Sequence, residues 1–379
     1  MSIGIRNSGV VTVLLVLAAV FCAGAQEQGM ELGDFRVPQY DEQGRMTYQL
    51  FGERAFLESD GRVNVEGVRV EFYREGNVFM EVSSPYCFYD RDKREVWSDA
   101  AVSTEMDDAV LTGTGYRLNV EARTVHVLNK SRLVFAAGMP ASEPDSDRSD
   151  PSGETVITSK ELFLDYNQRS ARFNESVRVE NEETVLECEK LDVFFDENNT
   201  LEKAVAESSV RISNQDMTMS CGALNVSFSG ENEIDEAVAD SSVVISNAEW
   251  TVSGARGRLM VSDRKALLEE DVRVESKEMT LTCAKLNLAF DESNEINWIE
   301  ALGDVRILNE GKKASSGKAV YTAETDEFLL EENPKLIDGK NMLMGDRIRF
   351  WRSTGRMVCE PARAVIFPDE DFKTQLFEK

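Results

Sequence analysis

The chain is short of the residues that zinc sites and disulfide frameworks need. It holds one histidine, His126, and six cysteines among 379 residues. Cys22 lies in an N-terminal segment that is discussed below, and the remaining cysteines are odd in number and widely spaced. A disulfide framework has a higher density of cysteines and is typical of smaller chains. With no second histidine, a zinc site would depend on cysteines and carboxylates. We therefore expect no metal and no cofactor, and we interpret His126 as an ordinary polar residue of a strand.

Sequence motifs of catalysis are missing as well. No Gly-rich phosphate loop precedes a helical pattern, and no G-x-S-x-G turn occurs. Carboxylates are plentiful, but they fall in turns and at solvent-facing strand positions, where their proximity carries little information. The sequence therefore predicts a protein that is not an enzyme.

Basic residues are few compared with acidic ones. The chain has 42 Lys and Arg against 69 Asp and Glu, and a formal net charge of -27. Such a chain repels phosphates, which weighs against nucleic acid or an anionic membrane as a charge-driven partner. A solvated acidic surface is a sufficient explanation of the charge. The length allows two or more domains.

Long apolar runs are confined to the N-terminus. Arg6 precedes an apolar run from Val10 to Phe21, and small residues follow at Ala23–Ala25. This order is typical of a signal peptide over residues 1–25 with cleavage after Ala25. The run is shorter than the ~20 residues of a membrane span, which favours a cleaved signal peptide. An uncleaved anchor is the alternative. The mature protein is therefore expected to be exported.

What the chain does contain is a repeat. Strings such as "TMSCGALNVSF" (Thr218–Phe228) place one small residue between two stretches of apolar–polar alternation. The alternation restarts one residue out of phase after this anchor, as in Leu224-x-Val226-x-Phe228 after Cys221. The anchors of the repeats are Ser159, Cys188, Cys221, Gly254, Cys283, Gly317 and Gly345.

The geometry of these repeats follows from the turns between them. Turn-like segments at 196–199, 230–233 and 291–295 have hairpin length, which predicts antiparallel neighbours. The segments between turns exceed an ordinary strand, and an extra residue at the anchor would make a bulge that bends the strand. A small residue fits the inside of such a bend. The predicted fold is all-β and elongated, with strands that fold over and contribute to two facing antiparallel sheets.

The N-terminal part shows a weaker version of the same pattern. Its anchors are Gly52, Ser84 and Gly113, with return strands at 63–72, 96–104 and 125–135. Residues 136–154 are rich in Pro, Ser, Asp and Gly and read as a linker. The predicted division is therefore 46–135 and 155–368, with loosely ordered ends at 26–45 and 369–379.

The inner apolar face is the feature with functional content. A fully packed interior would indicate a structural repeat protein, and a carbohydrate-active β-helix with such a core is a further alternative. A sheet left open along one side would instead offer a trough for acyl chains, whose burial is worth about 0.8 kcal/mol per methylene. The candidate lining residues are Leu186, Leu191, Val193, Phe195, Met219, Leu224, Val226, Phe228, Trp250, Leu259, Leu281, Leu286, Leu288 and Phe290.

The repeats resemble a known family. "TSKELFLDYNQRSARFNESVRV" (Thr158–Val179), "ECEKLDVFFDENNTLEKAVAESSVRI" (Glu187–Ile212) and "TCAKLNLAFDESNEINWIEALGDVRI" (Thr282–Ile307) are similar to OstA-like repeats of LptA-type lipopolysaccharide-transport proteins. "SSPYCFYDRDKREVWSDAAVST" (Ser83–Thr104) and "LTGTGYRLNVEARTVHVLNKSRLVF" (Leu111–Phe135) resemble the LptC-type partner of that pathway. The resemblance covers most of the mature chain.

That resemblance implies a folded-over β-jellyroll in the periplasm whose interior carries the acyl chains of lipid A between inner and outer membrane. It implies lipopolysaccharide, an inner-membrane lipopolysaccharide ABC exporter and an outer-membrane translocon as partners, and end-to-end self-association through unpaired end strands. This chain departs from the family in joining both module types. Its N-terminal segment also looks cleavable, which leaves membrane tethering open.

Overall fold

The computed structural model describes residues 31–365, apart from 59–61, 91–92, 94, 107–108, 120–121, 123, 137–153, 198–199, 230–232, 294, 352 and 355. All helices and strands assigned to these residues are β-strands, and their pairings are antiparallel. The predicted all-β, antiparallel fold is therefore confirmed. A parallel β-helix is excluded for the described part of the chain.

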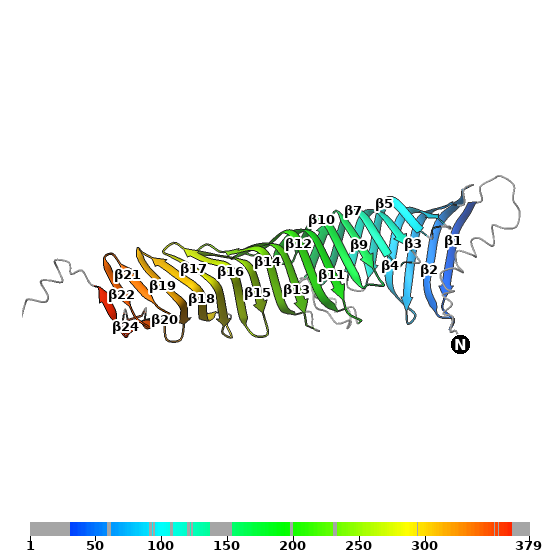
Figure 1. Cartoon of the computed structure of the whole chain (residues 1–379). Helices are drawn as coiled ribbons and strands as arrows, with labels where there is room; N and C mark the ends of the chain where they lie inside the picture. The colour runs from blue at the N-terminus through cyan, green and yellow to red at the C-terminus, as the bar shows by residue number, and fades with distance from the viewer. Residues whose placement is uncertain are drawn as a thin grey trace, which may run out of the picture. The chain divides into compact units, whose positions relative to one another are not determined.

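The chain divides into two compact units, residues 1–199 and 200–379. Within unit 1, successive strands lie side by side, and Figure 1 shows their ribbons curving over from one layer to the other. The strands of unit 1 are β1 (Glu31–Tyr40), β2 (Met46–Leu57), β3 (Arg62–Arg74), β4 (Asn77–Asp90), β5 (Glu95–Met106), β6 (Ala109–Asn119), β7 (Thr124–Ala136), β8 (Glu154–Ser159), β9 (Glu161–Asp165), β10 (Ser170–Glu180) and β11 (Val185–Phe195).

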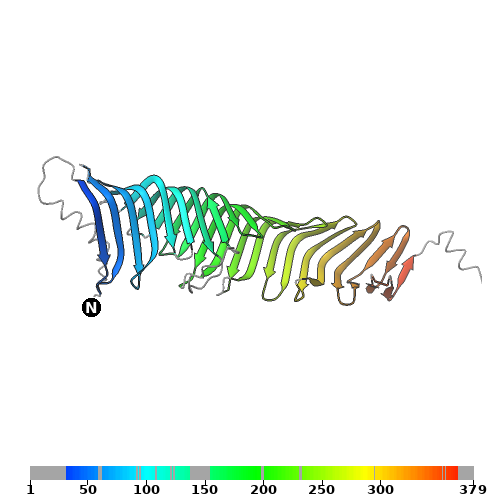
Figure 2. The same ribbon diagram turned by 180° about the vertical axis from the view of Figure 1, so that it is seen from behind.

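Unit 2 repeats the arrangement with long strands that shorten toward its C-terminal end, as Figure 2 shows from behind. There the bend breaks single strands into pairs of short ones, such as β20 and β21. The strands of unit 2 are β12 (Leu201–Ser213), β13 (Thr218–Phe228), β14 (Ile234–Ser246), β15 (Trp250–Met260), β16 (Lys265–Ser276), β17 (Met279–Phe290), β18 (Ile296–Asn309), β19 (Lys312–Thr322), β20 (Glu327–Glu331), β21 (Lys335–Asp338), β22 (Asn341–Met344), β23 (Arg347–Trp351), β24 (Met357–Glu360) and β25 (Arg363–Val365).

In the long strands of unit 2, the bend coincides with a shift of register. Between β12 and β13, Glu207 pairs with Ala223 and Val210 pairs with Cys221, so two residues of β12 oppose one of β13. Those two residues, Ser208 and Ser209, both have positive φ. The predicted bulge is therefore present, but its extra residue lies in the return strand and not beside the anchor. Phase inversion at the anchor is confirmed, since Cys221 and Leu224 are both buried.

The prediction of Gly317 as an anchor is wrong by one residue. Ser316 pairs with Val305, just as Cys283 pairs with Val272, and Ser316 is the buried residue of the two candidates. Gly317 follows it, and a Cβ at that position would collide with the side chain of Glu332. The anchor is therefore Ser316, and Gly317 is needed because the next return strand approaches closely.

The anchor positions hold small residues for two physical reasons. A Cβ at Gly113 would collide with Val127, so space is limiting at that bend. At three anchors, Ser84, Ser159 and Cys188, the side chain also donates a hydrogen bond to the carbonyl two residues on. Ser84 Oγ lies 3.1 Å from the Tyr86 carbonyl oxygen, and Cys188 Sγ lies 3.3 Å from that of Lys190. Buried carbonyls need such partners, which explains why serine and cysteine alternate with glycine here.

The predicted N-terminal return strands are confirmed as β3, β5 and β7. The prediction that residues 26–45 are loosely ordered is wrong for Glu31–Tyr40, which form β1 and pair with β2. Gly33 and Pro38 weaken the strand pattern there, yet proline is tolerated in a strand that has a neighbour on one side only, since its missing N–H is not needed.

Several predictions fall on residues that the structure does not describe. The signal peptide at 1–25, most of the linker at 136–154 and the tail at 369–379 lie outside the described residues. The strands that flank the linker pair with each other, with Ser131 opposite Ser159. The division into 46–135 and 155–368 stays a prediction. Within the described ranges, the structure holds no helix that combines the length and apolarity of a membrane span.

Candidate functional site

The interior of unit 2 is built from rows of apolar side chains that run across the strands. We call the residues after each anchor arm A and those before it arm B. The pairing register aligns the inward-facing side chains in four rows across the strands. The bend row contains the anchors and their partners, the first and second rows follow outward on arm A, and one row lies on arm B. The first row is Ala206, Leu224, Ala239, Gly257, Leu268, Leu286, Ala301, Ala319, Leu330 and Ile348.

Burial in unit 2 is confined to the bend row and the first row. Val272 in the bend row is 1% exposed and Leu286 in the first row 3% exposed. Leu288 in the second row and Leu281 on arm B pack against the same core cluster, but both are only partly buried. Unit 2 therefore has a buried apolar floor bordered on both arms by partly exposed apolar walls, and we call this apolar face the trough.

The interior of unit 1 is filled more deeply. Buried residues there reach the second row of arm A at Val63 and Tyr89, and arm B at Ile157. Tyr48 on arm B has its pKa raised to about 12, first by burial and then by the nearby Tyr89 on arm A. Burial therefore extends further along the arms in unit 1, which offers less accessible apolar wall than unit 2.

The candidate lining residues fall into three groups. Leu224 and Leu286 are buried in the floor of unit 2, and Leu191 and Val193 are buried in β11 of unit 1. Leu259 is exposed. The others are partly buried, and they are Leu186, Phe195, Met219, Val226, Phe228, Trp250, Leu281, Leu288 and Phe290. That they bind lipid stays a prediction.

Sequence reasoning missed the wall residues of the return strands. Ile299 pairs with Leu288, and Ile307 pairs with Leu281, so both lie in the same rows as predicted lining residues. Beyond them, Tyr321, Phe328 and Phe350 form an aromatic run with ring centroids 4.5 and 6.4 Å apart. The alternation of apolar and polar residues in the return-strand strings "ALGDVRIL" and "AVAESSVRIS" is the signal that could have identified wall residues such as Ile307.

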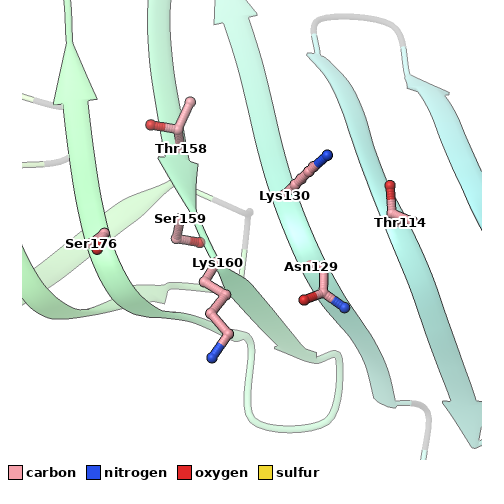
Figure 3. A pocket seen from close by; sticks show the side chains of 7 residues that line it. All are labelled: Thr114, Asn129, Lys130, Thr158, Ser159, Lys160 and Ser176. Atoms are coloured by element: carbon pink, nitrogen blue, oxygen red, sulfur yellow. The ribbon is translucent and has the colours of Figure 1, made fainter.

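A depression of about 600 Å³ at the bend of unit 1 is the main alternative site. It is lined by Thr114, Asn129, Lys130, Thr158, Ser159, Lys160 and Ser176. Figure 3 shows the two lysine side chains pointing away from each other. Lys160 Nζ lies 2.6 Å from Glu175 Oε2, which neutralises its charge. The polar groups do not converge, so the depression is a weak candidate.

The polar side chains of the interior are unsuited to covalent chemistry. Burial raises the pKa of Cys87 to about 12 and that of Cys221 and Cys283 to about 11, so these thiols stay protonated and unreactive. His126 lies in β7 with Nε2 3.5 Å from a carboxylate oxygen of Glu161 and its ring edge-on to Phe163. Within the described ranges, His, Cys, Asp and Glu form no group that could hold a metal ion.

Folded-over antiparallel strands around an apolar trough define the class of this protein, a bent-strand repeat fold with an accessible interior. Residues 251–356 match the family described as LptA/(LptD N-terminal domain) LPS transport protein. This segment runs from within β15 to just past β23, so the similarity to that family lies within unit 2. The predicted resemblance is confirmed there, and the LptC-type resemblance of the N-terminal part stays a prediction.

A solved structure with a similar segment is LptH of Pseudomonas aeruginosa, described as the LptA homologous periplasmic component of the conserved lipopolysaccharide transport device. The similarity covers 31% of this chain and 95% of that one, with 17% sequence identity and a TM-score of 0.29. No curated protein matches the chain.

Proposed function

We propose that the protein is a non-enzymatic, periplasmic carrier of lipopolysaccharide, and that the trough of unit 2 holds the acyl chains of lipid A. The single observation that carries this proposal is the partial exposure of apolar walls above a closed floor, in a unit that contains the matched transport domain. A repeat protein with a purely structural role would bury these walls.

Acyl chains suit the trough chemically. Its walls are aliphatic and aromatic, and each methylene that leaves water contributes about 0.8 kcal/mol. Leu281 and Leu288 present such surface from opposite arms of one strand, so a chain lying between the arms would contact both. The ligand would complete a core that the protein alone leaves open on one side.

Export and the partners follow from the same proposal. A carrier of this kind would receive lipopolysaccharide from an inner-membrane exporter and pass it toward an outer-membrane translocon. The signal peptide would direct it to the periplasm. End-to-end self-association through terminal strands also stays a prediction.

The proposal is tested with Phe228→Asp. Phe228 is partly buried at the end of β13, opposite Ile234 and away from the floor. A carboxylate there would oppose an acyl chain without disturbing the core, and we expect about tenfold weaker lipopolysaccharide binding or more. Binding is measured by displacement of a fluorescent fatty acid, and folding by circular dichroism.

Asn225→Asp is the matched control, because it adds the same charge to the outward-facing side of β13. It should leave binding unchanged. Undiminished binding by a folded Phe228→Asp protein would contradict the trough as the site. Failure of the unaltered protein to bind any acylated lipid would favour the structural alternative.

A further inference from the structure

Exposed apolar side chains lie along the outer edge of arm A in unit 2, on β14, β15, the β15–β16 turn and β18. Ile234 is 46% exposed, Leu259 40%, Val261 42% and Ile296 42%. Leu259 pairs with Ala237 on one side and Ala266 on the other, and these short side chains leave it uncovered. Exposed apolar residues gathered in one place mark an interaction site more often than isolated ones do.

Backbone hydrogen bonds join these positions into one ledge. Val261 N–H donates to the Asp235 carbonyl at 2.9 Å, and Arg264 N–H donates to the Val261 carbonyl at 3.0 Å. Phe290 N–H in turn donates to the Arg264 carbonyl at 2.9 Å. The start of β14, the β15–β16 turn and the end of β17 are thereby connected, and we call this surface the ledge.

The centre of the ledge carries two adjacent cations, and Asp263 precedes them in the same turn, so the turn has a net positive charge in an acidic chain. Arg264 and Lys265 are exposed at the β15–β16 turn, and neither forms an ion pair among the described residues. The turns on either side are acidic in sequence, "SGENE" at 229–233 and "DESNE" at 291–295. Two cations therefore lie close to Val261 in the chain, and among the described residues the neighbouring turns contribute carboxylates such as Glu233 and Glu292.

We propose that the β15–β16 turn binds the phosphate of an acylated, phosphorylated lipid, with Arg264 and Lys265 contacting the phosphate and Leu259 and Val261 contacting the start of an acyl chain. This inference rests on the proposed function and adds the place where the head group is held. A guanidinium offers two parallel donors to phosphate oxygens, and an ammonium adds a compact charge. Asp263 and the described carboxylates of the neighbouring turns, such as Glu233 and Glu292, repel phosphate and limit where along the ledge the head group can lie.

The experiment compares two lipids on two variants of the full chain. The probes are bisphosphorylated lipid A and the same lipid A after removal of its phosphates. In the variant Arg264→Ser/Lys265→Ser, binding of the bisphosphorylated probe should weaken about tenfold, because charge-assisted hydrogen bonds are lost. Binding of the dephosphorylated probe should stay within about twofold of the unaltered protein, because the apolar contacts remain.

Lys277→Ser/Lys313→Ser is the matched control, since both lysines are exposed in unit 2 on arm B and the change in net charge is the same. It should bind both probes like the unaltered protein. Equal affinity of Arg264→Ser/Lys265→Ser for the bisphosphorylated probe, or equal weakening for both probes, would overturn the head-group site while leaving the trough intact. Failure of the unaltered protein to bind either probe would overturn the proposed function itself.

Discussion

Leu286 and Leu288 lie two residues apart on β17, and truncating each to alanine separates floor from wall. Leu286 is 3% exposed in the first row, between Leu268 and Ala301. Leu288 is one row further out and partly buried. A fully buried leucine truncated to alanine costs about 2–5 kcal/mol, because transfer free energy and a cavity both count. For Leu288→Ala we expect about 1 kcal/mol, since less apolar surface leaves water on folding and no closed cavity forms.

The order of the two variants should be reversed for ligand binding, where Leu288→Ala should have the larger effect. Leu288→Ala removes wall surface and should weaken lipopolysaccharide binding severalfold, whereas Leu286→Ala should affect binding little at a temperature where it remains folded. Unfolding is followed by circular dichroism in urea, and binding by fluorescent fatty-acid displacement. Equal losses of stability would refute the distinction between a closed floor and accessible walls, as would a larger loss for Leu288→Ala.

Two further predictions concern titratable groups. Cys221 and Cys283 should react with a disulfide reagent at pH 8 only after unfolding, because burial raises their pKa to about 11, while the partly buried Cys359 should react sooner; rapid labelling of Cys221 in the folded protein would contradict this. The pKa of Glu300 is lowered below its ordinary value of 4.5, mainly by the hydrogen bond from Lys318. Ionised Glu300 therefore adds stability above pH 4.5 that is lost as the pH falls through its lower folded-state pKa. The difference in urea midpoint between the unaltered protein and Glu300→Gln should shrink from pH 7 to pH 3, and a constant difference would count against this assignment.

Much of the fold could be predicted because burial alternates with strand period. The inversion of phase across Cys221 is visible in the letters, since Met219 and Leu224 must both face the interior of a bent strand. Turn residues then fixed the antiparallel connection. The position of the extra residue could not be predicted, because Ser208 and Ser209 look like ordinary strand residues and adopt positive φ only under the constraint of the fold.

The accessible walls could not be predicted from the sequence. Leu286 and Leu288 have the same side chain and the same position in the alternation, yet one is floor and the other wall. The difference depends on how far the two arms diverge, which is a property of tertiary packing. In unit 1, larger interior side chains such as Tyr89 and Phe173 are buried, and no signal in the spacing distinguished the two units.

The net charge of the chain gives a different answer from its local charges. A formal charge of -27 argues against an extended anionic surface as a partner, because long-range repulsion opposes its approach. A single phosphate beside the β15–β16 turn is a different case. Charges more than about 10 Å apart are largely screened in salt, so the nearest groups decide its binding. Arg264 and Lys265 outnumber Asp263 at this turn, and described carboxylates such as Glu233 and Glu292 limit where a phosphate can bind. A strongly acidic carrier and a specific site for an anionic head group are therefore compatible, and the acidic outer surface would also keep protein molecules with exposed apolar walls from associating through them.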